Sequence, residues 1–349
     1  MRRKLILIQF SRALVPVLVM LFHVSANMKG YWDYDLLKMS TLPVSGGVNY
    51  FFALSGFMLF YIYKEKFGQS GELKKYLLNR FIRIYPLYWV LTLIALPTLL
   101  LFPFLGLENK IDYDSVIHSL LLLPHPQGTE PILDIAWSLV YTVYFYLIFA
   151  LFFLSKRIIP AVILSVWGLI SIGFMTDLFW SAEKITYFFF YQYNLIFLAG
   201  ILCAYLLTRI KLNQPLSILT ASLGFITFPL LWWNEYQQAV NISFDIGTGL
   251  ASALIIFGLA SIDIQKEISL HKSLYYLGNA SLSIYLAHNL PLNTFSHIFY
   301  KIGLFELIGG PAVSILLLAM ITGVGCLVHS FIEKPIVAYS KKKIFKPVS

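Results

Sequence analysis

Apolar runs of about 20 residues recur along the whole chain, separated by short polar segments. A helix of this length spans about 30 Å, the thickness of the hydrocarbon core of a bilayer. Helices are required because a backbone that crosses lipid must satisfy its own hydrogen bonds. The runs predict an all-α, polytopic membrane helix bundle of about ten transmembrane helices, with approximate limits 5–25, 44–63, 82–105, 133–154, 158–180, 186–208, 214–233, 244–262, 280–300 and 308–333.

The run at 280–300 is the least regular of these segments, because Asn289, Pro291 and Asn293 interrupt it. No polar block between the runs is large enough to fold separately. We therefore expect one membrane domain over residues 1–340, followed by a basic cytoplasmic tail over residues 341–349.

Composition and charge agree with a membrane location. The chain is 58% hydrophobic and 12% charged, whereas a soluble domain carries about 25% charged residues. If the N-terminus is cytoplasmic, about twenty of the 26 Lys and Arg residues lie on the cytoplasmic side, as the positive-inside rule requires. Both termini are then predicted to be cytoplasmic, and this topology explains the basic pI of 9.3 without a nucleic-acid partner.

The sequence predicts neither a metal site nor a disulfide. Cys203 and Cys326 lie in separate apolar runs, without a CxxC motif or a spacing suited to a metal. His118 and His125 lie in a polar segment, and their spacing fits no common ligand pattern, so we interpret them as loop residues.

Arg12 and His23 are ionisable residues inside the first span, where a charge is costly and usually functional. They are eleven positions apart, so at 100° per residue they lie within about 20° of one another on one helix face and about 16 Å apart along it. Arginine binds anions and phosphates, and histidine exchanges protons near neutral pH. The alternative is that Arg12 extends to the interface and His23 bonds a neighbouring helix.

Arg80 and Arg83 begin the third span and are followed by Tyr85 in "IYPLYW". Two arginines one turn apart can hold a phosphate or pyrophosphate from the cytosol. The alternative is an ordinary positive-inside anchor with an aromatic belt.

Two further groups lie near the C-terminus. His288 interrupts an apolar run and is a functional candidate. Glu333 follows His329 by four residues on the same helix face, and Glu333 with Lys334 is interpreted as the cap of the last span.

Taken together, these segments resemble the acyltransferase-3 family of bacterial membrane proteins, and within it the exopolysaccharide O-acetyltransferases of the succinoglycan type. The resemblance is distributed over most of the chain. It rests on Arg12 and His23 with ten residues between them, "GGVNYFFALSGFMLF" at 46–60, Arg80 and Arg83 with the following "IYPLYW", "PILDIAWSLVYTVYFYLIFAL" at 131–151, "LGNASLSIYLAHN" at 277–289 and "IEKP" at 332–335.

The resemblance implies roles for particular residues. His23 and Arg12 would be catalytic, with His23 acting either as general base on the acceptor hydroxyl or as transient carrier of the acyl group. Arg80, Arg83 and Tyr85 would bind the donor. Supporting or acceptor-side roles would fall to Asn49, Ser55, Trp137, Ser138, Thr142 and His288.

Thr142 departs from the family pattern, which usually has a glutamate at this position, five residues after the tryptophan of the segment. A threonine can donate or accept a hydrogen bond but cannot serve as a carboxylate base. Three explanations stay open: another acid such as Asp134 or Asp245 approaches the cavity, the glutamate is dispensable in this branch, or the protein is catalytically weakened.

The activity that the resemblance implies is transfer of an acyl group, usually acetyl, from acyl-coenzyme A to a sugar hydroxyl of an exopolysaccharide or another cell-envelope glycan. Acetyl-CoA would be a donor substrate, no cofactor would be bound permanently, and the protein would lie in the bacterial cytoplasmic (inner) membrane. The acceptor, either lipid-linked or polymerised, would meet Tyr31, Trp32, Asp33, Asp35 and loop 106–132. The competing interpretations are a catalytically weakened relative and a carrier or flippase, although no inverted repeat supports the carrier.

Overall fold

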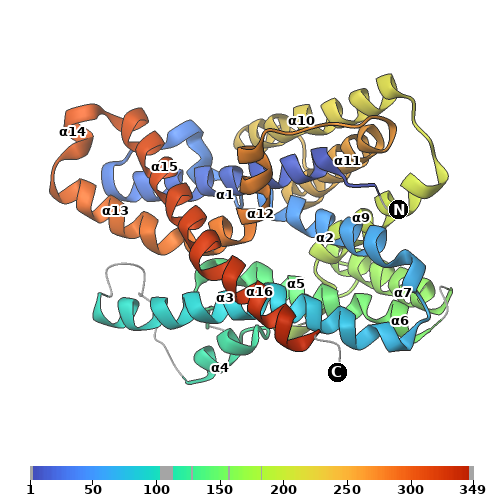
Figure 1. The fold of residues 1–349 in the computed structure, drawn as a ribbon. Coiled ribbons are helices and arrows are strands. Elements are labelled where there is room, and N and C mark those ends of the chain that lie inside the picture. The colour runs from blue at the N-terminus through green and yellow to red at the C-terminus, as the bar shows by residue number, and fades with distance from the viewer. Residues whose placement is uncertain (1–2, 103–112, 127–128, 156–157, 182, 346–349) are drawn as a thin grey trace. The chain divides into compact units, whose positions relative to one another are not determined.

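The computed structural model describes residues 3–102, 113–126, 129–155, 158–181 and 183–345. Every regular element in these ranges is a helix, which confirms the all-α prediction (Figure 1). Parts of the predicted outer loop, 106–112 and 127–128, and of the tail, 346–349, lie outside the described ranges.

The described helices include 8 stretches long and apolar enough to cross a membrane, so the chain is a polytopic helical membrane protein. These stretches are Ile6–Trp32, Ser70–Leu101, Asp134–Leu154, Ile158–Met175, Ile185–Arg209, Gln214–Gln237, Phe244–Gln265 and Gly310–Ile344. The other two predicted spans, 44–63 and 280–300, fall on the 17-residue helix α2 (Gly47–Tyr63) and on a pair of helices that meet at His288.

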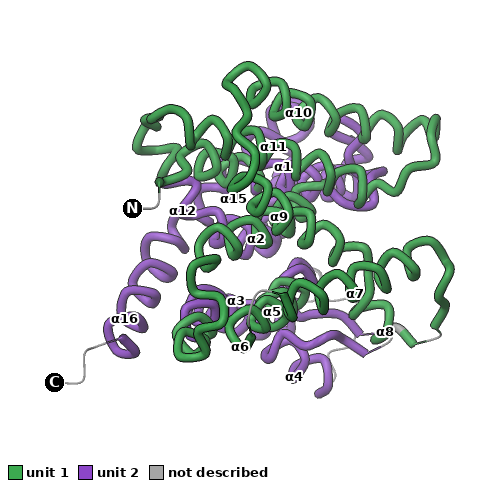
Figure 2. The backbone as a smooth tube through the Cα atoms, turned by 90° about the vertical axis from the view of Figure 1, so that its right-hand side faces the viewer, with its two compact units in different colours: residues 1–15, 46–77, 140–275 green, residues 16–45, 78–139, 276–349 purple. Residues whose placement is uncertain are grey.

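The chain divides into two compact units, each built from discontinuous segments (Figure 2). Unit 1 holds residues 1–15, 46–77 and 140–275, and unit 2 holds residues 16–45, 78–139 and 276–349. Four helices pass from one unit into the other: α1 (Ile6–Trp32), α3 (Leu73–Leu101), α5 (Trp137–Phe149) and α12 (Lys272–Ala287).

Glycines set the close helix packing of unit 1. Its other helices are α2, α6 (Leu151–Leu154), α7 (Ile158–Met175), α8 (Lys184–Phe190), α9 (Tyr193–Arg209), α10 (Gln214–Gln237) and α11 (Phe244–Gln265). A Cβ on Gly56 of α2 would lie 2.1 Å from the Phe197 carbonyl oxygen, and one on Gly200 of α9 would lie 1.8 Å from the Ala53 carbonyl oxygen. Small residues let membrane helices approach to backbone contact, so the "SG" of the second predicted span is a packing site.

Replacing Gly200 with alanine is expected to destabilise the protein, because the added Cβ would overlap the backbone of α2. Overpacking of this kind costs about 1–3 kcal/mol or more. The matched control is Gly323→Ala on α15, where an added Cβ meets nothing within 4 Å. Thermal unfolding in detergent should show a lowered midpoint only for Gly200→Ala, and equal midpoints for both variants would contradict the close approach of α2 and α9.

A buried carboxylate of α11, that of Asp263, accepts hydrogen bonds from the N-terminal N–H groups of α1. Asp263 is 2% exposed and accepts hydrogen bonds from the backbone N–H groups of Leu7, at 2.9 Å, and Ile8, at 3.2 Å. These N–H groups have no partner within their own helix, and a negative charge at a helix N-terminus is stabilising. Asp263 thereby fixes where α1 begins in unit 1.

Unit 2 packs the second half of α1 against helices from the C-terminal third of the chain. Its other elements are η1 (Leu36–Thr41), α4 (Tyr113–Leu121), η5 (Asp134–Ala136), α13 (Asn289–Lys301), α14 (Leu304–Ile308), α15 (Gly310–Val328), the π-helical turn η6 (His329–Glu333) and α16 (Lys334–Ile344). Met20, Val24 and Met28 of α1 join one buried cluster with residues of α12, α13 and α15. The apolar face of α1 therefore determines which side of that helix turns towards α12 and α13.

The predicted irregularity of residues 280–300 is confirmed as a break at His288 between α12 and α13. Pro291 explains it, because proline lacks an N–H and its ring clashes with the carbonyl four residues earlier, that of Ala287. The break leaves a histidine at a point where the helical hydrogen bonds are interrupted.

Candidate active site at His23 and His288

His288 presents one free basic nitrogen inside unit 2. The residue is 0% exposed, and its Nδ1 lies 2.6 Å from the carbonyl oxygen of Tyr285. A carbonyl oxygen only accepts, so Nδ1 carries a proton, and in the neutral imidazole Nε2 then carries the lone pair. Nε2 is buried without a hydrogen-bond partner among the described residues. A buried polar atom in this state is costly and points to a function.

His23 of α1 faces His288. Their ring centroids are 5.0 Å apart, with 52° between the ring planes. His23 is half-buried, so it is the more accessible member of the pair. The sequence identified each histidine singly, and the structure brings them together within unit 2.

A buried hydroxyl pair supports this arrangement. Ser138, at the start of α5, lies 2.7 Å from the Tyr285 hydroxyl, which also donates to the Ile135 carbonyl at 3.1 Å. Tyr285 is the residue whose carbonyl sets the protonated nitrogen of His288. Through its bond to the Tyr285 side chain, Ser138 helps to fix the turn of α12 that carries this carbonyl. The neighbouring Trp137 is half-buried.

Of the two acids considered from the sequence, Asp134 shares unit 2 with the two histidines. Its Oδ2 accepts from Nδ2 of Asn289, at 3.2 Å, next to His288 in the chain. The other acid considered from the sequence, Asp245, lies in unit 1, where it accepts from Asn49 and Gln192. Thr142 also belongs to unit 1. Asp134 is therefore the one of these two acids that shares a unit with His288, and it bonds the residue next to that histidine.

A pocket of about 180 Å³ lies between helices of unit 2, and residues on both sides of His288 in the chain line it. Its polar groups are Asp134, Asn289 and Asn293. The rest of its wall is aliphatic, apart from one proline, and comes from α3, residues 132–135, α12, α13, α15 and η6. The pocket suits a small group with a polar end and an apolar end.

Arg12 lies on α1 as predicted, in the segment that belongs to unit 1. Its Nη1 donates to Oε1 of Gln9 at 3.1 Å, one turn earlier. The neighbouring Ser11 accepts from the Tyr50 hydroxyl at 2.5 Å. These bonds hold the first turns of α1 around Arg12.

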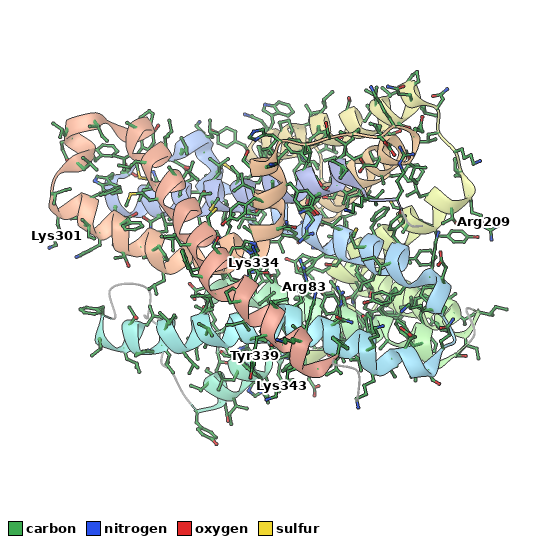
Figure 3. The ribbon with its side chains drawn as sticks, viewed as in Figure 1. Arg83, Arg209, Lys301, Lys334, Tyr339 and Lys343 are labelled. Carbon is green, nitrogen blue, oxygen red and sulfur yellow. The ribbon has the colours of Figure 1, made fainter. Side chains whose placement is uncertain are left out.

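The predicted donor-binding residues share the helix α3. Arg80 and Arg83 are both partly buried in unit 2, and Figure 3 shows Arg83 projecting from this helix. The hydroxyl of Tyr85 donates to the Leu121 carbonyl at 2.9 Å, and Tyr88 likewise donates to the Ser119 carbonyl at 2.8 Å. The aromatic residues after the arginines therefore tie α4 to α3.

Asn49 and Ser55 lie on α2 in unit 1. Asn49 is fully buried, and its Nδ2 donates to Asp245, at 2.9 Å, and to Thr248, at 2.8 Å. These bonds join α2 to α11. Ser55 is half-buried beside the packing residue Gly56.

Asp35, considered above for sugar contact, has a structural role in the segment after α1. It accepts from the hydroxyls of Ser25 and Ser40 and from the Ser40 backbone N–H. Burial alone would raise the pKa of this carboxyl, but these bonds and the nearby charge of Lys29 lower it below its ordinary value. Asp35 therefore remains charged at neutral pH and stabilises this turn.

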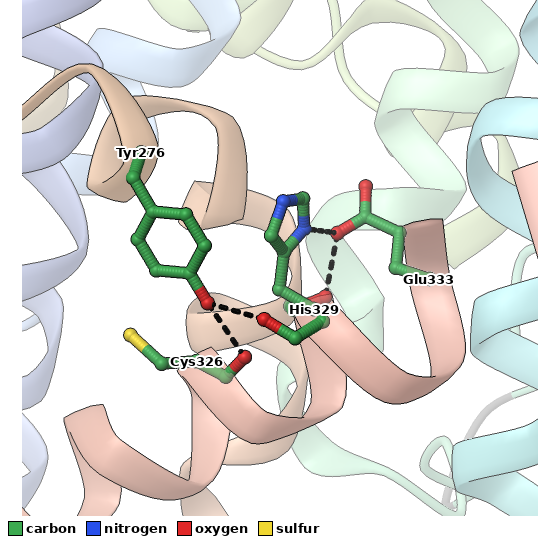
Figure 4. A network of polar contacts seen from close by, with 6 residues as sticks. Tyr276, Cys326, His329 and Glu333 are labelled. Carbon is green, nitrogen blue, oxygen red and sulfur yellow. Dashed lines mark hydrogen bonds and ion pairs between the residues drawn. The ribbon is translucent and has the colours of Figure 1, made fainter. Parts of the chain in front are cut away.

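A buried hydrogen-bond network around Glu333, which the sequence did not predict, lies at the end of α15 (Figure 4). Oε2 of Glu333 lies 2.6 Å from Nδ1 of His329 and accepts from the Ser283 hydroxyl at 2.6 Å. Beside it, the Tyr276 hydroxyl lies 2.6 Å from Ser330. The four-residue spacing of His329 and Glu333 had placed them on one helix face. The sequence predicted that Glu333 caps the last span, whereas in the structure its side chain bonds Ser283 and so joins the end of α15 to α12.

Comparisons with known proteins identify the family of this chain. Residues 7–330 match the acyltransferase-3 family, described as an acyltransferase domain. Over 303 residues the chain is 28% identical to the exopolysaccharide production protein ExoZ of Rhizobium meliloti (strain 1021), covering 84% of this chain and 89% of that protein. No solved structure matches significantly. Since the family match covers nearly the whole chain, this protein belongs to the acyltransferase-3 family of membrane acyltransferases.

Proposed function

We propose that this acyltransferase moves an acyl group, acetyl in the simplest case, from acyl-coenzyme A to a sugar hydroxyl of an exopolysaccharide or another cell-envelope glycan. The observation that carries the proposal is the pair of imidazoles 5.0 Å apart, one with an unpartnered buried Nε2. The similarity to a protein named for exopolysaccharide production supports the glycan acceptor. Acetyl-CoA is a substrate here, and no permanently bound cofactor is required.

His23 is the residue proposed to act on the acceptor. Neutral imidazole is basic at neutral pH, so His23 can take the proton of the sugar hydroxyl as its oxygen attacks the thioester carbonyl. The carbon–sulfur bond then breaks, and the coenzyme A thiolate takes the proton back from His23. The products are a sugar ester and free coenzyme A, so protons balance over the cycle.

His288 is proposed to position His23. Because its Nδ1 is committed to Tyr285, only Nε2 can accept a proton or a hydrogen bond from the neighbouring ring. A catalytic base oriented by a third group is a recurring arrangement in enzymes that activate hydroxyls. The adjacent pocket of about 180 Å³ has room for a short acyl group against its aliphatic wall.

The donor is proposed to arrive from the cytoplasm, where coenzyme A is available. Its phosphates would pair with Arg80 and Arg83, whose guanidinium groups form charge-assisted hydrogen bonds to phosphate oxygens. Arg12 would add a positive charge along α1. The glycan acceptor would enter from the opposite side of a bacterial cytoplasmic membrane.

Replacing Arg80 and Arg83 together by glutamine is expected to raise the KM for acyl-CoA by about a hundredfold or more, because each charged hydrogen bond contributes about 1.5–3 kcal/mol, which is tenfold or more for each arginine. The kcat should change little. The control is Lys74→Gln with Lys75→Gln, which removes two charges from the same helix. An unchanged KM in the arginine variant would show that Arg80 and Arg83 only anchor the topology.

The proposal as a whole is tested with isolated membranes. Membranes containing the protein should transfer radiolabelled acetyl from acetyl-CoA to added polysaccharide, and membranes without it should not. Equal labelling of the polysaccharide in both preparations would contradict the proposed activity.

A further inference from the structure

One pocket in unit 1 has no part in the proposed reaction. It has a volume of about 970 Å³ and lies between α2, α7 and α9. Its lining from α9 includes Leu195, Leu198, Leu202, Tyr205 and Arg209. These positions recur every three or four residues, so they form one stripe along one face of α9.

The stripe changes from apolar to basic along its length. From Leu195 to Arg209 it extends about 21 Å, which exceeds the roughly 15 Å of hydrocarbon in one leaflet. Aliphatic and aromatic side chains cover most of this length, and the charged groups gather at one end, where Lys64, Glu65 and Arg209 line the pocket. Two positive charges against one negative charge leave that end with a net positive charge.

The two basic side chains at this end, Lys64 and Arg209, each lie near an aromatic ring of their own helix or its end. The guanidinium carbon of Arg209 lies 5.4 Å from the ring centroid of Tyr205, and Nζ of Lys64 lies 5.9 Å from that of Tyr61. Figure 3 shows Arg209 at the end of α9. The positive-inside rule places this end of both helices on the cytoplasmic side.

We propose that this pocket binds one anionic diacyl phospholipid of the cytoplasmic leaflet, with its phosphate at Lys64 and Arg209 and an acyl chain along the α9 stripe. Basic pockets between membrane helices on the cytoplasmic side bind anionic lipid headgroups. The apolar lining matches the lipid tails, and the net positive end matches an anionic headgroup better than a zwitterionic one. The site is separate from the two histidines and requires no assumption about the reaction.

Binding of phosphatidylglycerol and phosphatidylcholine with identical chains, measured by native mass spectrometry on the delipidated protein, tests the proposal. The wild type should prefer phosphatidylglycerol. Lys64→Gln with Arg209→Gln should weaken phosphatidylglycerol binding about 30-fold, the factor expected for two charges near the membrane surface. Lys341→Gln with Lys342→Gln, which removes two basic residues of α16, should keep the wild-type affinity.

A second variant tests the apolar part of the pocket independently of charge. Ala199→Trp should fill the groove and weaken phosphatidylglycerol binding while Lys64 and Arg209 remain, which keeps the proposal testable if the double variant does not fold. Equal binding of the two lipids to the wild type, or equal losses in the pocket variant and the α16 control, would overturn the proposal. Competition by soluble glycerol phosphate as effective as that by the lipid would assign the site to a free phosphate instead.

Discussion

Replacing His23 with glutamine is expected to reduce acyl transfer by about 100- to 10,000-fold, the contribution typical of a general base. Glutamine keeps the approximate size and polarity of the side chain but cannot take a proton at neutral pH. His23 is half-buried on α1 and lies against the fully buried His288, so it is the more exposed member of the pair. Transfer of labelled acetyl from acetyl-CoA, measured at saturating donor, gives the change in kcat directly.

The matched control for this variant is His271→Gln. His271 is exposed, and its Nδ1 lies 2.8 Å from the hydroxyl of Ser273, so its loss should leave transfer unchanged. Both variants should insert into the membrane and elute from a sizing column as the wild type does. Full activity in His23→Gln would show that His23 is not the general base.

Replacing His288 with glutamine is expected to lower kcat by about 100-fold or more, because loss of the group that orients a catalytic imidazole costs up to about 10,000-fold in serine proteases. Nε2 of His288 is buried and has no hydrogen-bond partner among the residues that the structure describes, and the Nδ1 contact with Tyr285 fixes which nitrogen is basic. The substitution should also change the pH dependence of kcat, since it changes the group that faces His23.

The double variant His23→Gln with His288→Gln separates positioning from a purely structural role. Residues that act as one unit are strongly non-additive, so the double variant should be no slower than His23→Gln alone. Losses that multiply, together with an unchanged pH profile for His288→Gln, would mean that His288 only supports the fold.

Hydropathy predicted the class of fold because membrane helices must be long, apolar and internally hydrogen-bonded. It also predicted the irregular segment around Pro291, where α12 ends and α13 begins at His288. It did not predict the division into two units, because which helices share a unit depends on side-chain packing between segments distant in sequence. The glycine contacts of Gly56 and Gly200 are of this kind.

The candidate site was predictable only in part, for the same reason. Helical spacing relates residues of one helix, so it placed Arg12 with His23 and His329 with Glu333 on common faces. The approach of His23 to His288 depends on how the apolar face of α1 packs in unit 2. The spacing of residues within one helix does not predict this packing. Among the acids that might replace a glutamate at Thr142, the sequence offered Asp134 and Asp245 equally. The hydrogen bond from Asn289 favours Asp134.

The ester content of the envelope polysaccharide, measured by nuclear magnetic resonance, tests most directly whether this protein transfers acyl groups to a glycan through His23. Polysaccharide would be compared from cells with the gene, cells without it, and deleted cells that express either the wild type or His23→Gln. We expect a specific O-acyl signal to disappear on deletion, to return with the wild-type protein and to stay absent with His23→Gln. An O-acyl signal that is unchanged by deletion would contradict the proposed acyl transfer.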